Sequence, residues 1–181
     1  CCTANSPRLS AKAADMCVTS ITLLEGPWRA LPASLKTPAN QPLRVICLLD
    51  RHGESGLIAL KDAVMRCPKA LLALTVIDSS RPAHHQSTQQ WNGCSITWIG
   101  AMDRAAFSSL LHSQAVWIEP TLVGGDDPAL AKEVLSAGLW MLATDCSAAA
   151  DVIQAGRNGS VISSTEPSKW NRALLQLCRQ H

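Results

Sequence analysis

Residues 43–49 read Leu-Arg-Val-Ile-Cys-Leu-Leu, an almost continuous apolar run. A strand of a parallel sheet is buried on both faces, so it carries such a run instead of an alternating pattern. Directly afterwards, apolar residues recur at helical spacing from Leu57 to Met65, and Pro68 follows the end of that pattern. The segment therefore predicts a strand followed by a helix, the first unit of a parallel sheet.

The same alternation continues to the end of the chain. Further strands are expected at 71–77, 94–99, 115–118, 139–143 and 161–162. Further helices are expected at 103–112, 128–137, 148–155 and 167–178. The polar stretch 78–92 is predicted to be a long loop. Strands that alternate with helices imply right-handed crossovers, so we predict an α/β fold: a Rossmann-like parallel sheet with helices on both faces.

The first 42 residues have a different character. A helix is expected at 6–14 and a strand at 18–24. One glycine and four prolines then interrupt residues 26–42, which show little periodicity. We interpret residues 1–42 as the tail of a preceding domain plus a linker, and 43–181 as the ligand-binding domain. Because the N-terminus has neither an initiator Met nor a signal-peptide pattern, we expect the sequence to be part of a longer chain.

Composition excludes several classes of protein. The chain has 181 residues, 47% of them apolar and 17% charged, which is typical of soluble globular domains and not of disordered tails. A net charge of +2 gives no indication of a nucleic-acid partner, and no apolar stretch is long enough to span a bilayer. The eight cysteines are irregularly spaced, and Cys47, Cys94 and Cys146 lie in or beside predicted buried strands, so we favour reduced thiols in the cytoplasm over a disulfide framework. CxxC and zinc-site spacings are absent as well. No metal and no cofactor is expected.

The loop after the fourth predicted strand is the strongest candidate for a ligand site. Ligands of open parallel sheets bind beyond the carboxyl ends of the strands. Gly124 and Gly125 allow a tight backbone turn, Asp127 is a good N-cap, and Pro128 fits the first helical position. Together these features suit an anion such as a diphosphate. The alternative is an ordinary strand-to-helix loop with a good cap.

Two further polar side chains lie at predicted strand ends or on the following helix. Glu133 falls at the margin of the apolar face of its helix, where a carboxylate can accept two hydrogen bonds from vicinal ribose hydroxyls. Arg51 follows the first strand on a Gly-rich loop and is suited to neutralising a phosphate. The alternatives are a surface glutamate and a solvated polar turn.

Five short segments follow one another in a recognisable order. They read Ile-Thr-Trp-Ile-Gly at 96–100, Ala-Val-Trp-Ile-Glu-Pro-Thr at 115–121, Lys-Glu-Val-Leu-Ser-Ala-Gly at 132–138, Leu-Ala-Thr-Asp at 142–145 and Asp-Val-Ile-Gln-Ala-Gly-Arg-Asn-Gly at 151–159. In this order they resemble the C-terminal domain of family 4 retaining glycosyltransferases of the GT-B architecture. Residues 45–63 fit the first strand and helix of that domain more loosely, and residues 4–25 look like the tail of its N-terminal domain.

The resemblance implies a nucleoside diphosphate sugar, UDP- or GDP-linked, bound without a metal. Glu133 would contact the ribose, the loop 124–127 would face sugar and diphosphate, and Arg51 would hold the phosphates. The substrate-binding residues that it implies are Gly100, Thr121, Gly124, Gly125, Asp127, Ala129, Leu130 and Glu133.

Two positions depart from the family pattern. The family has an acidic residue eight positions before Glu133, where this chain has Gly125, and the adjacent Asp126 is the substitute. The family also has a Lys before the Gly that opens the first helix, where Ser55 precedes Gly56 here. A missing cation weakens stabilisation of the departing diphosphate by about 3–4 kcal/mol in comparable sites. The compensating cation is Arg51 or a cation from the absent domain; without either, the donor site is degenerate. Arg51 and Asp126 are the expected catalytic residues.

The parent protein is thus expected to transfer a sugar, with retention, to a glycan, lipid or protein acceptor. Bacterial surface polysaccharide assembly is the usual context, in the cytoplasm or at the inner face of the membrane, with peripheral attachment through the missing part. The other partner is the N-terminal domain of the same protein, and this chain alone is expected to be inactive. The alternative is a non-catalytic scaffold domain with a degenerate donor site. A receiver-like signalling domain fits less well, because the relevant strand ends in Ile99-Gly100 rather than in an acidic cluster.

Overall fold

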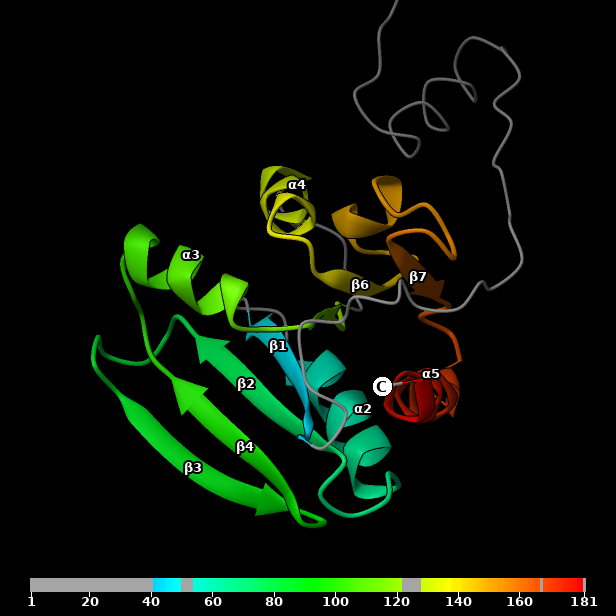
Figure 1. Cartoon of the computed structure of the whole chain (residues 1–181), viewed down its shortest axis with the longest axis horizontal. Coiled ribbons are helices and arrows are strands. Elements are labelled where there is room, and N and C mark those ends of the chain that lie inside the picture. Colours follow the sequence, from blue (N-terminus) through cyan, green and yellow to red (C-terminus); the bar gives the residue numbers. More distant parts are fainter. Residues whose placement is uncertain (1–40, 50–53, 122–127, 167, 181) are drawn as a thin grey trace, which may run out of the picture.

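One seven-stranded sheet organises the molecule (Figure 1). The computed structural model describes residues 41–49, 54–121, 128–166 and 168–180. The strands run in the order β3-β4-β2-β1-β5-β6-β7. Their bounds are β1 Leu43–Leu49, β2 Leu72–Asp78, β3 Gln86–Trp91, β4 Cys94–Ile99, β5 Val116–Glu119, β6 Trp140–Thr144 and β7 Gly159–Ile162. All neighbours pair in parallel except β3 with β4, which confirms the predicted fold class.

Helices cover both faces of this sheet (Figure 1). The helices are α2 Glu54–Met65, α3 Arg104–His112, α4 Pro128–Ser136, the short 3-10 helix η1 Ala148–Asp151 and α5 Ser168–Gln180. Helices α2 and α5 pack together on one face, whereas α3, α4 and η1 lie over the other. Because neighbouring residues of a strand point to opposite faces, each buried strand supplies both layers with apolar side chains.

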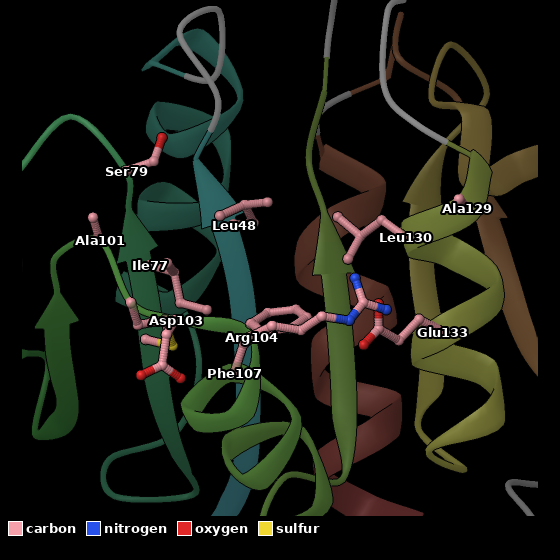
Figure 2. Close-up of a pocket in the computed structure, with 11 residues that line it drawn as sticks. Leu48, Ile77, Ser79, Ala101, Asp103, Arg104, Phe107, Ala129, Leu130 and Glu133 are labelled. Atoms are coloured by element: carbon pink, nitrogen blue, oxygen red, sulfur yellow. The ribbon is translucent and has the colours of Figure 1, made fainter.

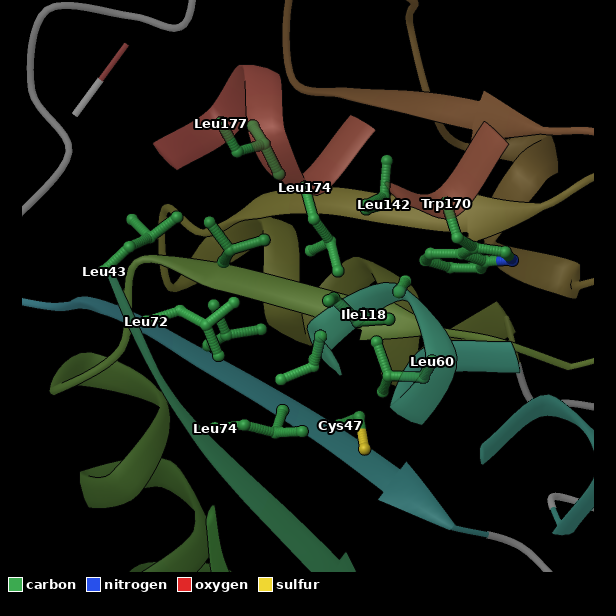
Figure 3. Packing of buried hydrophobic residues seen from close by; sticks show 14 of the residues in the cluster. Leu43, Cys47, Leu60, Leu72, Leu74, Ile118, Leu142, Trp170, Leu174 and Leu177 are labelled. Carbon is green, nitrogen blue, oxygen red and sulfur yellow. The ribbon is translucent and has the colours of Figure 1, made fainter. Parts of the chain in front are cut away.

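The core under α5 shows how an amphipathic helix is held. Trp170, Leu174 and Leu177 are buried at helical spacing and lie over β5 and β6, where Ile118 and Leu142 meet them (Figure 3). The polar positions of α5 face outward, so the helix closes one layer of the domain.

The prediction of a continuous loop at 78–92 is wrong. Residues 86–91 form β3, an edge strand that pairs antiparallel with β4 through a hairpin at Asn92-Gly93. Asn92 and Gly93 both have positive φ, 49° and 79°, as the tight hairpin turn requires. The side chains of 86–90 are exposed and polar, so the strand has no apolar pattern for a sequence to reveal. The only buried residue of β3 is Trp91, whose ring stands edge-on to that of Trp98 with the ring centroids 6.4 Å apart.

The prediction of a helix at 148–155 is also wrong, since the segment makes a single 3-10 turn. Ser147 caps that turn by accepting a hydrogen bond from the amide of Ala149. Other predicted boundaries are confirmed: the carboxylate of Asp103 caps α3, and Gly138 follows α4 with a φ of 79°. Cysteines 47, 67, 94, 146 and 178 form no disulfide. Among the described residues, no helix has the length and apolar character needed to cross a membrane.

Candidate functional site

A cavity of about 550 Å³ lies at the carboxyl edge of the sheet, between α3 and α4 (Figure 2). Its apolar lining consists of Leu48 from β1, Ile77 from β2, Ala101, Met102, Phe107, Ala129 and Leu130. Ser79, Asp103, Arg104 and Glu133 add polar groups. The chain enters α3 after β4, passes over β1 and β2, and returns as β5 on the far side of β1. The cavity therefore lies beside the position where the strand order reverses, as expected for this class of sheet.

Glu133 points into this cavity from α4. Its side chain is 25% exposed, and its Oε2 accepts a hydrogen bond of 3.0 Å from Nη2 of Arg104 on α3. Figure 2 shows the Arg104 side chain reaching across to Glu133. The ion pair thus joins the two helices that form the walls.

The position of Arg104 is not explained by stability. It is the first residue of α3, where a cation opposes the helix dipole at a cost of about 0.3–1 kcal/mol. Its side chain is 83% exposed, and an ion pair with such a partner contributes about 0–1 kcal/mol. The two contributions nearly cancel. The pair therefore sets the charge of the cavity more than it stabilises the fold.

The apolar wall is held rigidly from behind. Phe107 stands edge-on to Trp117 of β5, with ring centroids 6.2 Å apart and planes at 88°. Trp117 is fully buried and donates its indole N–H to Oε2 of Glu119 at 3.2 Å. Because Glu119 also accepts a hydrogen bond from Ser147, this aromatic pair is anchored to both β5 and the start of η1.

The structure brings together three of the residues predicted to bind the substrate: Ala129, Leu130 and Glu133. Arg51, Gly124, Gly125, Asp126 and Asp127 lie outside the described residues. Their roles remain predictions.

Two other predicted residues do not line the cavity. Gly100 packs so closely on Pro82 that an added Cβ would lie 2.0 Å from the Pro82 carbonyl oxygen, so this glycine serves the packing of the loop after β2. Thr121 is buried, and its carbonyl oxygen accepts hydrogen bonds from Thr144 and from the thiol of Cys146 at 2.8 Å. Neither residue lines the cavity as far as the structure describes it, and their substrate contacts stay predictions.

The contribution of α3 to the cavity was not predicted from the sequence. Its start, Met102 to Arg104, supplies an apolar side chain and the cation, and Phe107 supplies the aromatic wall. A signal was present, because β4 ends at the same edge of the sheet as β1 and β5, so the residues after Gly100 belong to the same row of loops. The pairing of Arg104 with Glu133 had no signal, since 29 residues separate them.

Known structures share this arrangement of strands and helices. WaaG, a glycosyltransferase involved in lipopolysaccharide biosynthesis, matches with a TM-score of 0.60 at 18% identity, over 77% of this chain and 39% of WaaG. A UDP-forming α,α-trehalose-phosphate synthase from Burkholderia xenovorans matches with a TM-score of 0.57 at 15% identity, over 78% of this chain and 39% of the synthase. No family model matches the sequence. No curated protein matches it either.

The fold matches one half of the GT-B fold seen in these glycosyltransferase structures. A third match, a trehalose-6-phosphate protein from E. coli bound with UDP-2-fluoro glucose, has a TM-score of 0.56 at 13% identity, over 75% of this chain and 36% of that protein. The chain spans about two fifths of the length of these GT-B structures. At these identities the likeness extends to the fold alone.

The cavity combines apolar surface with a few charged groups. An apolar body with a few polar groups suits a ligand that has a flat apolar part and hydroxyl or charged groups. The described lining holds two carboxylates and one guanidinium, but no Cys, Lys or His that would act as an activated nucleophile or base. Glu133 retains the acceptor capacity of Oε1 alongside its contact with Arg104.

Proposed function

We propose that this chain is the donor-binding C-terminal domain of a family 4 retaining glycosyltransferase, and that its cavity binds a nucleoside diphosphate sugar. The carrying observation is the place of Glu133: its carboxylate lines the cavity within one helical turn of Ala129, at the start of α4. A carboxylate accepts hydrogen bonds from both hydroxyls of a ribose, and a helix start favours negative charge. The two ends of a nucleoside diphosphate thus have complementary groups on one helix.

The apolar part of the cavity suits the nucleobase. Leu48, Ile77 and Phe107 offer flat apolar surface for a planar ring. A volume of about 550 Å³ falls within the range of about 300–1,000 Å³ usual for small-molecule sites. The sugar and diphosphate would then extend towards the loop 122–127 and Arg51.

The remaining parts of the proposal follow from the family. A second domain would carry the acceptor, with transfer in the cleft between the domains and retention of configuration. Asp126 and Arg51 would act on the reacting sugar phosphate. The parent protein would work in the cytoplasm or at the inner face of the membrane, in glycan assembly. Because this chain spans about two fifths of the length of the GT-B structures it matches, we expect it to bind donor without transferring sugar.

Ribose recognition gives the sharpest test. Isothermal calorimetry should compare UDP with 2′-deoxy-UDP, and GDP with 2′-deoxy-GDP, on the wild-type chain and on Glu133→Ala. For UDP or for GDP, we expect the wild type to bind the ribonucleotide about tenfold more tightly than its 2′-deoxy form, since one charge-assisted hydrogen bond contributes ~1.5 kcal/mol. The Glu133→Ala variant should bind that ribonucleotide more weakly and lose the preference. Glu166→Ala is the matched control, because Glu166 is exposed and pairs with Lys169 outside the cavity.

Each outcome has a defined meaning. Equal loss of both nucleotides in Glu133→Ala would contradict the ribose contact. The absence of any nucleotide binding at millimolar concentration would contradict donor binding altogether. That result would favour the alternative, a scaffold domain that has kept the fold with a degenerate donor site.

A further inference from the structure

Arg104 pairs with the carboxylate that is proposed to bind the donor. Its Nη2 lies 3.0 Å from Oε2 of Glu133, the carboxylate proposed to hold the ribose. A diol that binds both oxygens of a carboxylate must share or replace that contact. The free cavity therefore has its proposed ribose acceptor already engaged by a cation.

The same guanidinium is the only cation among the described residues that line the cavity, beside the carboxylates of Asp103 and Glu133. Asp103 is committed to capping α3, accepting from the amide of Ala106 at 2.8 Å. Without Arg104, the charged side chains of the described lining would all be carboxylates. Binding of a ligand with phosphate groups therefore needs the positive charge of Arg104 beside the phosphates and not beside Glu133.

Arg104 is free to move between the two roles. Its side chain is 83% exposed and is long and flexible, and its contact with Glu133 uses one nitrogen on one oxygen. Glu133 lies four residues after Ala129, about 6 Å along α4 at the helical rise of ~1.5 Å per residue. An arginine side chain spans such a distance by changing rotamers. The phosphates, drawn to the start of α4, would thus lie within its range.

We propose that Arg104 is a specificity residue that exchanges partners on binding: it neutralises Glu133 in the free protein and moves to the ligand's phosphate when the ribose takes Glu133. This inference rests on the proposed donor site and adds a charge-reading element to it. The exchange makes a nucleoside without phosphate a poor ligand, because it must break the ion pair without giving Arg104 another anion.

The test compares a nucleoside with its diphosphate on the full 181-residue chain. Calorimetry should use uridine with UDP, and guanosine with GDP, on wild type, Arg104→Ala and Arg104→Lys. We expect opposite changes in Arg104→Ala: the diphosphate binds about five- to tenfold more weakly, while the nucleoside binds about two- to threefold more tightly. Arg104→Lys should retain most of the diphosphate affinity. Arg172→Ala is the control, since Arg172 is exposed on α5, over the opposite face of the sheet.

The outcomes separate this inference from the function on which it rests. If the wild type binds the diphosphate and Glu133→Ala weakens it, but Arg104→Ala shifts nucleoside and diphosphate in the same direction or not at all, the exchange is refuted while the donor site stands. If no nucleotide or nucleoside binds the wild type at millimolar concentration, both are refuted. A chain that unfolds in Arg104→Ala would contradict the small stability contribution that the exposed pair implies, and the Arg104→Lys comparison would then decide the charge requirement alone.

Discussion

Gly56 fixes the start of α2 against the end of β5, and replacing it with alanine tests how tightly the carboxyl edge is built. A Cβ placed on Gly56 would lie 1.7 Å from the carbonyl oxygen of Pro120 and 2.7 Å from its carbonyl carbon. Carbon contacts below 3.0 Å are essentially never seen, so helix and strand end must separate by about 1.3 Å. The obstructing atoms belong to the backbone, so no side-chain rotation relieves the overlap.

The free energy of unfolding should fall by about 2 kcal/mol. Forcing a methyl group into a packed site costs ~1–3 kcal/mol, and more where only backbone can move. Alanine returns ~1 kcal/mol of helix propensity, which reduces the net loss. Since domains of this size lose about 1–3 kcal/mol per molar urea, the unfolding midpoint should drop by roughly 1 M.

The assay is urea unfolding followed by tryptophan fluorescence, because Trp117 and Trp170 are fully buried reporters. Asp62 provides the matched control, since it is exposed on the same helix. There Asp62→Ala should be more stable than Asp62→Gly by ~1 kcal/mol, the ordinary preference of a helix. The reasoning is refuted if Gly56→Ala is as stable as the wild type, because the helix start would then have room that the structure denies.

Three further predictions concern the core, the polar edge and the thiols. Trp170→Ala should lower the free energy of unfolding by about 3–5 kcal/mol, because the side chain is 1% exposed between α5 and the sheet; a change below 1 kcal/mol in urea unfolding would contradict that packing. Burial raises the pKa of Asp78, but hydrogen bonds from Ser80 and Arg81 outweigh it and hold the pKa below the ordinary 3.8. A depressed pKa stabilises the fold above the unfolded value, so Asp78→Asn should be less stable than wild type at pH 7, with the difference shrinking below pH 3.8; a constant difference down to pH 2.5 would contradict this. Burial also raises the pKa of Cys47 to about 12, so iodoacetamide at pH 8 should modify half-buried Cys146 well before Cys47, as peptide mapping by mass spectrometry would show; equal rates would argue against a closed core.

The sequence predicts the buried parts of the fold well, for a physical reason. Parallel strands such as β1 and β6 are enclosed on both faces, so only apolar runs can form them. This rule does not apply to β3, because it is an edge strand with exposed side chains that is held by backbone hydrogen bonds to β4. Its sequence signal lies instead in the turn Asn92-Gly93, a dipeptide that favours a two-residue hairpin.

In the candidate site, too, some features follow from local sequence patterns and others depend on long-range packing. Glu133 and Leu130 could be placed on the cavity side of α4, because helical periodicity alone fixes which residues share a face. The ion pair with Arg104 depends on how α3 and α4 are packed on the same face of the sheet, which no local pattern encodes. Likewise, Thr121 matches a family position by order in the chain, yet it does not line the described cavity, and its carbonyl oxygen accepts hydrogen bonds from Thr144 and Cys146.

The place of the ligand is the central claim, and amide chemical shifts test it most directly. A ¹⁵N-labelled chain should be titrated with UDP and with GDP, with the backbone resonances assigned. The largest shift changes are predicted for Ala101 to Arg104 and for Ala129 to Glu133, the two segments that face each other across the cavity. Changes confined to α5 or to the β3–β4 hairpin, or none with either nucleotide at millimolar concentration, would contradict the account.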